Sequence, residues 1–302
     1  VMDVAGFNYR PHKYQENYKK LPQQIILGSE TASTVSSRGV YKFPVVRRAM
    51  QKYDDHQSSS YDVEHCGWSN LPEDDFIQHE DLPYCIGEFV WTGFDYLGEP
   101  TPYYTDWPSH SSLFGIIDLA GLPKDRYYLY RSHWNKDKET LHILPHWNWE
   151  GREGQKILVY AYTNCSEVEL FLNGRSLGRK QVEACGHGEW RVPYEAGALM
   201  AKGYRNGVCM AEDHQETTGK PAALKLRIEA GEEILANGED VAILTCYCVD
   251  KEGREVPDAS MEVSFYTEGP GSIAATGSDV CDHVPPAWPN RGMRAGKCTV
   301  LV

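Results

Sequence analysis

The segment IILGSE places a carboxylate at the point where a buried strand would end. Ile25, Ile26 and Leu27 are apolar, so the segment favours a β-strand that stops at Glu30. In α/β proteins the carboxyl ends of parallel strands gather the functional groups. Glu30 is therefore either a reactive carboxylate or a solvated residue where the strand gives way to a helix.

Two further expected strands end in side chains suited to the same chemistry. Asn8 and Tyr9 follow one strand, and Trp91 and Asp95 lie near the end of another. A carboxylate can attack or stabilise an oxocarbenium-like sugar carbon, and a tyrosine hydroxyl can hold that carboxylate ionised. An indole ring can stack on the apolar face of a pyranose. Because strand-end acids are often only solvated, spacing alone leaves both alternatives open.

The elements around these residues alternate between strand and helix over residues 1–136. Strands are predicted at residues 3–9, 23–30 and 85–96, and helices at residues 43–53 and 123–135, each with a proline near its start. Apolar strands separated by helices predict a parallel sheet with helices packed outside it.

The pattern changes near Lys136 to short alternating strands and turns. In EVELFLNGRSLG the apolar residues Val168, Leu170 and Leu172 alternate with polar ones, and an Asn-Gly pair follows them. Asn-Gly is a strong hairpin signal, so residues 138–219 are predicted to form a β-sandwich.

Residues 220–302 carry a second set of alternating strands, including ALKLRIEA and DVAILTCYCVD. This spacing predicts an immunoglobulin-like sandwich. Cys246 and Cys248 are separated by one residue, so on a strand they share a face and are expected to pack there. No pair among the nine cysteines has the C-x-x-C spacing of zinc or redox sites.

The charge and hydropathy of the chain limit the classes of partner that it can bind. The net charge of the 302 residues is −13, which disfavours nucleic acid or an anionic membrane surface as a partner. No apolar run approaches the roughly 20 residues that cross a bilayer. The opening VMDVAGFNYR reads as a strand already under way, so we expect a fragment of a longer protein.

Two motifs carry a family resemblance. IILGSETAS and GEFVWTGFDYLGEPTPY strongly resemble the second half of the catalytic barrel in family 2 glycoside hydrolases, which include β-galactosidases, β-glucuronidases and β-mannosidases. DVAGFNYR is similar to the sixth barrel strand, IILGSE to the seventh and IGEFVWTGFDY to the eighth. Residues 141–180 are similar to the β domain that follows the barrel in many members called β-galactosidases.

The resemblance implies an architecture and an activity. The fold would be a partial (β/α)8 TIM barrel at residues 1–137, followed by two immunoglobulin-like β-sandwich domains at residues 138–219 and 220–302. The activity would be that of a retaining β-glycoside hydrolase, most simply a β-galactosidase, with no cofactor and no metal. We expect a β-galactoside substrate, the upstream barrel half as a partner, a possible homo-oligomer, and a periplasmic or extracellular location.

The resemblance also implies roles for individual residues. Glu30 falls where the family places its nucleophile, and Tyr9 where it keeps a tyrosine near that nucleophile. Asn8 lines the same pocket, Trp91 shapes the sugar subsite, and Asp95 is expected to bind a sugar hydroxyl. The family's acid/base glutamate belongs to an earlier strand that precedes this sequence, so we expect the chain alone to be inactive.

Several other residues have two interpretations. Trp68 in EHCGWSN is expected on a sugar-binding wall, whereas a metal site at His65 and Cys66 is disfavoured because no second pair of ligands is near. Glu88 is either a substrate contact or a structural carboxylate paired with Arg or Lys, and Glu99 is expected in a loop.

Aromatic and acidic clusters outside the barrel motifs are read as structural. LHILPHWNWEG, with Trp147 and its neighbours, is expected to plug the domain junction rather than to bind sugar. The adjacent Ser109 and His110 are not expected to form a catalytic pair. Asp279 and Asp282 suggest calcium, but their spacing favours an irregular loop. A second class of function remains: a non-catalytic carbohydrate-binding or structural fragment of a larger glycosidase.

Overall fold

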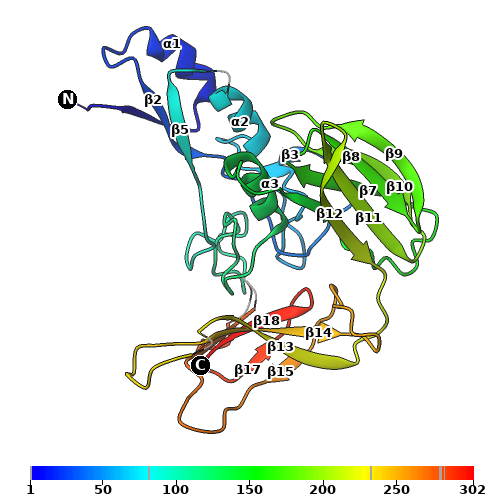
Figure 1. Ribbon diagram of the computed structural model, residues 1–302. Helices are drawn as coiled ribbons and strands as arrows, with labels where there is room; N and C mark the ends of the chain where they lie inside the picture. Colours follow the sequence, from blue (N-terminus) through cyan, green and yellow to red (C-terminus); the bar gives the residue numbers. More distant parts are fainter. Residues whose placement is uncertain (1, 81, 232, 279–280, 282) are drawn as a thin grey trace.

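A computed structural model describes residues 2–80, 82–231, 233–278, 281 and 283–302. Three parts follow one another along the chain: a parallel sheet with helices, a pair of antiparallel sheets, and a second pair (Figure 1). Within the described ranges, no helix is long and apolar enough to cross a membrane.

The first part is built on three parallel strands in the order β1-β2-β5. They are β1 (Ala5–Asn8), β2 (Ile26–Thr31) and β5 (Cys85–Val90). The three predicted strands and their parallel direction are confirmed, but the third ends at Val90 and not near residue 96, so Trp91 and Asp95 lie in the segment that follows it. Their register sets Asn8 beside Glu30, so the side chains proposed from the sequence meet at one end of the sheet.

Helices pack beside this sheet and join it to the second part, while Ile86 and Phe89 of β5 stay exposed. They are a 3-10 turn (Pro11–Lys13), α1 (Tyr14–Tyr18), α2 (Pro72–Glu80) and α3 (Asp125–Trp134). The predicted helix at 123–135 is confirmed, although it begins two residues after Pro123. Helix α3 lies against the second part, where Leu129 and Tyr130 share a buried cluster with Tyr160 and Tyr162.

The helix predicted at residues 43–53 is wrong. The segment is extended and contains the two-residue strand β3 (Arg48–Ala49), which pairs in parallel with β4 (Glu64–His65). The backbone N–H groups of Arg48 and Met50 donate to the carbonyls of Val63 and His65. These bonds to a distant segment replace the helical ones, which two adjacent β-branched valines already disfavour.

The second part consists of two antiparallel sheets around one apolar core. One sheet contains β6 (Leu141–Leu144), β7 (Lys156–Thr163) and β10 (Gly188–Pro193). The other contains β8 (Glu167–Leu172), β9 (Arg175–Gln181), β11 (Ala198–Arg205) and β12 (Val208–Glu216). Val168, Leu170 and Leu172 are buried between them, as their alternation predicts. The turn after them has positive φ at Asn173 (51°) and Gly174 (77°), the geometry of a type I′ hairpin.

The third part again has two antiparallel sheets. The larger contains β13 (Ala223–Ala230), β14 (Ile243–Val249), β16 (Ala275–Gly277) and β18 (Lys297–Leu301). The smaller contains β15 (Glu262–Ser264) and β17 (Asn290–Gly292). Cys246 and Cys248 face the core of this part, where Cys298 lies directly opposite Cys246 on β18. The predicted packing of the two cysteines on one face is confirmed.

Loops of the first part hold the third part in place. The guanidinium of Arg38 pairs with Asp118 at 2.6 Å and also donates to the carbonyls of Ala295 and Ser278. The ring of Trp107, in the long loop after β5, stacks on His283 with centroids 4.0 Å apart. The third part therefore contacts the segment that follows the last parallel strand (Figure 1).

Candidate functional site

The ends of β1 and β2 bring Asn8 and Glu30 into direct contact. The Asn8 amide donates from Nδ2 to Oε1 of Glu30 at 2.8 Å, and its Oδ1 accepts from the Ser29 hydroxyl at 2.7 Å. Because one end of the amide accepts and the other donates, its orientation is set by both neighbours. Glu30 is half-buried. The hydrogen bond from Asn8 holds its Oε1 oxygen to the neighbouring strand β1.

Tyr9 lies beside the same carboxylate. Its backbone N–H donates to the carbonyl of Glu30 at 2.9 Å, and its φ of 53° turns the chain sharply after β1. The Ser33 hydroxyl donates to the Tyr9 hydroxyl oxygen at 2.7 Å. Burial, together with the Glu30 carboxylate, raises the pKa of Tyr9 well above its ordinary value, against the opposing effect of Ser33. The phenol therefore stays protonated and can donate to the carboxylate.

Trp91 directly follows β5, the strand on the other side of β2 from Asn8. Its backbone N–H donates to the carbonyl of Thr31 at 2.8 Å, and its indole N–H donates to the Tyr96 hydroxyl at 3.2 Å. Tyr96 in turn donates to the exposed Glu99. This chain of hydrogen bonds fixes the indole ring and gives Glu99, expected only as a loop residue, a partner.

A loop carrying Trp68 is tied to the residues just after β2. The backbone N–H of Cys66 donates to the Ser33 carbonyl at 2.9 Å, and the Ser69 hydroxyl accepts from the Ser33 N–H at 2.7 Å. Trp68 lies between these anchors and is 45% exposed. The sequence prediction included Trp68 but not Ser33, whose role rests on pairing with a segment more than 30 residues away.

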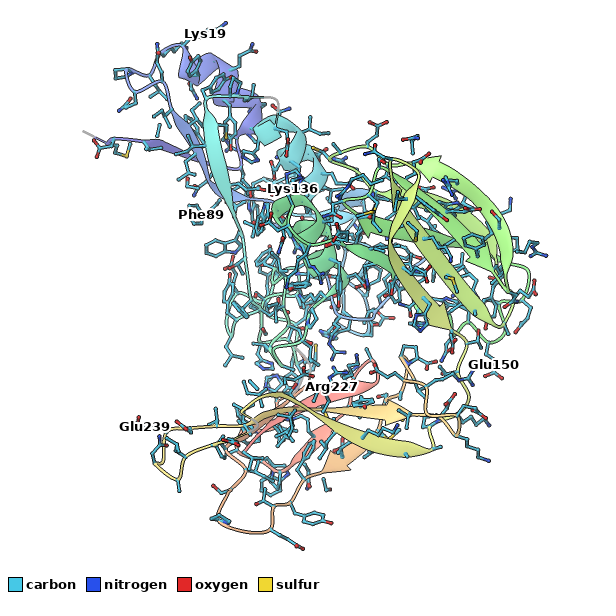
Figure 2. The ribbon with its side chains drawn as sticks, viewed as in Figure 1. Lys19, Phe89, Lys136, Glu150, Arg227 and Glu239 are labelled. Carbon is cyan, nitrogen blue, oxygen red and sulfur yellow. The ribbon has the colours of Figure 1, made fainter. Side chains whose placement is uncertain are left out.

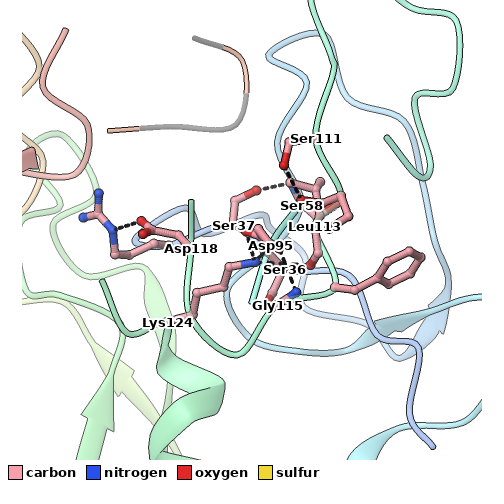
Figure 3. A network of polar contacts seen from close by, with 12 residues as sticks. Ser36, Ser37, Ser58, Asp95, Ser111, Leu113, Gly115, Asp118 and Lys124 are labelled. Atoms are coloured by element: carbon pink, nitrogen blue, oxygen red, sulfur yellow. Dashed lines mark hydrogen bonds and ion pairs between the residues drawn. The ribbon is translucent and has the colours of Figure 1, made fainter. Parts of the chain in front are cut away.

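Asp95 does not lie with this group, and the expectation that its carboxylate binds a sugar hydroxyl is wrong. Its side chain is fully buried, 2.7 Å from the Lys124 ammonium, and its Oδ1 accepts from the Gly115 N–H at 2.7 Å (Figure 3). Burial raises the pKa of Asp95 and lowers that of Lys124, while the charge of each partner opposes the shift. Asp95 is a structural anchor for the loop after β5.

Glu88 faces the helices, not the strand end. Its carboxylate accepts from the Thr31 hydroxyl at 2.8 Å and from the Trp134 indole at 3.2 Å, and it lies 3.6 Å from His79. The structural interpretation holds, but the partners are not the expected Arg or Lys.

The remaining candidates lie apart from Glu30. Trp147 is buried in the core of the second part and donates to the carbonyl of Glu195 at 2.9 Å, as a structural residue should. His110 contacts the Pro108 carbonyl, and its ring centroid lies 4.0 Å from that of His283, with the two planes tilted by 43°. Among the residues that the structure describes, no group of three or more His, Cys, Asp or Glu side chains is arranged to hold a metal ion. Asp279 and Asp282 lie outside the described residues.

The arrangement at the strand ends suits sugar chemistry. One carboxylate is oriented by an amide, a protonated phenol lies beside it, and an indole is held at the neighbouring strand end. These groups can place a nucleophilic oxygen against a sugar carbon and hold the ring.

Two family models match the chain. Residues 224–302 match the glycoside hydrolase family 2 C-terminal domain 5, and residues 154–211 match a domain of unknown function, DUF4982.

Named relatives extend these matches over most of the chain. The chain is 40% identical over 284 residues to the β-galactosidase BoGH2A of Bacteroides ovatus, a match that covers 91% of this chain and 33% of that protein. It is 38% identical over 195 residues to a putative β-glucuronidase of Formosa agariphila, covering 63% of this chain and 18% of that one.

A solved structure is similar over the full chain. A β-glycosidase from Bacteroides vulgatus superposes with a TM-score of 0.88 and 31% identity, covering 100% of this chain and 42% of that protein. The chain therefore spans less than half the length of each of these relatives.

Proposed function

Because the chain belongs to glycoside hydrolase family 2, we propose that Glu30 is the nucleophile of a retaining β-glycosidase that hydrolyses terminal β-galactosides. The observation that carries this proposal is the contact between Asn8 and Glu30 at the ends of adjacent parallel strands. Two carboxylates were expected at these strand ends. Glu30 accepts a hydrogen bond from Asn8, whereas Asp95 is buried in an ion pair with Lys124.

The proposed reaction has two displacements. A carboxylate oxygen of Glu30 attacks the anomeric carbon as the bond to the glycosidic oxygen breaks, and a second carboxylic acid about 5–5.5 Å away protonates the leaving oxygen. Water then attacks the glycosyl ester, the second group takes its proton, and Glu30 is released. The Asn8 amide orients the nucleophile, the Tyr9 phenol stabilises its charge, and Trp91 and Trp68 hold the sugar.

The same proposal covers the architecture. The strands β1, β2 and β5 would be the last three of a (β/α)8 barrel at residues 1–137. Immunoglobulin-like sandwiches would follow at 138–219 and 220–302. Their parallel order and the paired antiparallel sheets support this division.

The β-galactoside is favoured over the alternatives by the extent of the similarity. The named β-galactosidase matches 91% of the chain, and the putative β-glucuronidase matches 63%. A glucuronide or mannoside substrate is the alternative, and we propose a periplasmic or extracellular location.

Mechanism-based labelling tests the nucleophile. The protein, at its full encoded length, is incubated with 2,4-dinitrophenyl 2-deoxy-2-fluoro-β-galactoside, digested, and analysed by mass spectrometry. We expect the label on Glu30 and its loss in Glu30→Gln. Glu88→Gln is the matched control, because Glu88 lies on the neighbouring strand but faces the helices. Labelling of Glu30 should persist in this variant.

The other outcomes separate the alternatives. A label that forms only with the glucuronide or mannoside analogue keeps the mechanism and changes the substrate. A label on another carboxylate removes Glu30 as the nucleophile. No label with any of the three sugars favours a non-catalytic carbohydrate-binding or structural role.

A further inference from the structure

A groove of about 1030 Å³ lies where the third part meets the rest of the chain. One wall is the larger sheet of the third part. The other is made by the edge of the second part and by the first part, through residues 38–41, residues 119–123 and the first half of α3. The five residues considered at the strand ends, namely Asn8, Tyr9, Glu30, Trp91 and Asp95, and the loop residue Trp68 are absent from the described lining. The groove is therefore a separate feature from the site at Glu30.

The sheet wall is the face of β14 and β18 that turns away from their own core. Cys246 and Cys298 point into that core, so their neighbours Thr245 and Thr299 point the opposite way, into the groove. Arg227 pairs with Thr245 in the ladder and extends this face onto β13. Figure 2 labels Arg227 on the side of the third part that faces the rest of the chain.

Charges on this wall balance one another. The Arg227 guanidinium lies 2.9 Å from Glu229 and 3.5 Å from Glu255, and Lys297 lies 2.9 Å from Glu255. Two cations and two carboxylates thus form one connected row. Because each charge already has a partner, the wall does not favour a ligand of either net charge.

Thr299 places a buried hydroxyl on the same wall. Thr299 is 4% exposed, and its Oγ1 has no hydrogen-bond partner among the described residues. Buried hydroxyls in native proteins are normally hydrogen-bonded, so a bound group facing Thr299 would complete it. The hydroxyl can donate or accept.

The opposite wall adds rings and further polar groups. The ring of Tyr128 stacks on His142 with centroids 3.9 Å apart, and His142 bonds to Asp125 at 2.6 Å. Both rings line the groove. Their positions are therefore fixed, and a sugar ring can pack its C–H face against such a pair.

We propose that this groove binds a neutral oligosaccharide, at a site separate from Glu30. A balanced row of charges, an unsatisfied hydroxyl and a held aromatic pair together match a ligand rich in hydroxyls and without charge. The groove would hold a glycan chain on the protein whether or not Glu30 performs the chemistry proposed above.

Calorimetric titration tests the proposal in the Glu30→Gln background, with the protein at its full encoded length. The probes are β-1,4-galactotetraose, cellotetraose and xylotetraose, with tetragalacturonate as the anionic comparison. We expect at least one neutral tetraose to bind, with a Kd that changes little between about 0.1 M and about 1 M NaCl, because no net charge is matched.

Two variants of the same kind locate the binding. Leu301→Trp fills the groove and should weaken binding by roughly tenfold or more. Leu226→Trp is the matched control, because Leu226 is 57% exposed and alternates to the opposite face of the same sheet, so its Kd should not change. Thr299→Val removes one hydroxyl at nearly constant volume and should raise Kd by roughly 3- to 10-fold.

The outcomes of this titration distinguish failure of the groove proposal from failure of the proposed function of Glu30. Binding that Leu301→Trp and Thr299→Val leave intact would place the sugar elsewhere and overturn the proposal. Tighter, salt-dependent binding of tetragalacturonate, or no binding of any neutral tetraose, would also overturn it. When Leu301→Trp is made alone, with Glu30 unchanged, the 2-fluoro sugar should still label Glu30. Failure at one site therefore does not imply failure at the other.

Discussion

The Asn8 amide and the Glu30 carboxylate lie on adjacent parallel strands, and Nδ2 of one is 2.8 Å from Oε1 of the other. The Ser29 hydroxyl holds the far end of the same amide. An acid at the end of one strand is therefore oriented by an amide at the end of the next.

Loss of this contact should slow catalysis. In Asn8→Ala, made in the protein at its full encoded length, we expect kcat on an aryl β-galactoside to fall by roughly 10- to 100-fold, because a hydrogen bond to a charged group contributes about 1.5–3 kcal/mol. Steady-state kinetics check this, with Asn17→Ala, on helix α1, as the control. An unchanged kcat would mean that the amide does not act on the reacting carboxylate.

The Tyr9 hydroxyl should matter for rate and little for folding. Tyr9→Phe keeps the ring and removes the donor beside Glu30, so we expect kcat to fall by roughly 10-fold or more while Tm stays nearly constant. Thermal unfolding measured beside the kinetics separates the two effects. A large drop in Tm with no kinetic loss at low temperature would assign the hydroxyl a structural role instead.

The buried pair of Asp95 and Lys124 should reveal itself through non-additive stability. Lys124→Met leaves a buried carboxylate without its cation and should lower the free energy of unfolding by about 3–5 kcal/mol. Adding Asp95→Leu removes the orphaned charge, so the double variant should recover much of that loss. Urea unfolding of the single and double variants checks this, and simple additivity would contradict it.

Asp75 on helix α2 should make stability depend on pH. Burial raises its pKa to about 7, and the nearby Glu88 carboxylate adds to the shift. Because the folded pKa exceeds the unfolded one, the contribution of this group is complete below about pH 4 and is lost as the pH rises through 7. Asp75→Asn should therefore match wild type near pH 4 and be more stable above pH 7, by up to about 4 kcal/mol.

Thermal unfolding at several pH values measures this difference, with the exposed Asp137→Asn as the control. If Asp75→Asn had the same offset from wild type at pH 4 and pH 8, the burial of Asp75 would not control its ionisation.

Local signals in the sequence were sufficient for much of the fold. The apolar run before Glu30 predicted β2, and alternation at Val168, Leu170 and Leu172 predicted a half-buried strand, because side-chain period follows directly from backbone geometry. The Asn-Gly pair after that strand predicted its hairpin, because few residues tolerate two positive φ angles.

Other features could not be read from neighbouring residues. Residues 43–53 have some helical spacing, but their backbone donates to residues 63–65 instead. The orientation of Glu88 toward Trp134 likewise depends on a helix 46 residues later in the chain.

The sequence by itself determined the strands, the hairpin turn and the identity of the acid at the strand end, because these depend on residue type and short spacing. Only the tertiary structure decided that Glu30 meets Asn8 and Tyr9 whereas Asp95 is buried against Lys124. Both are acids near the ends of parallel strands. Their different environments come from long-range packing, which places polar neighbours beside one and a buried cation beside the other.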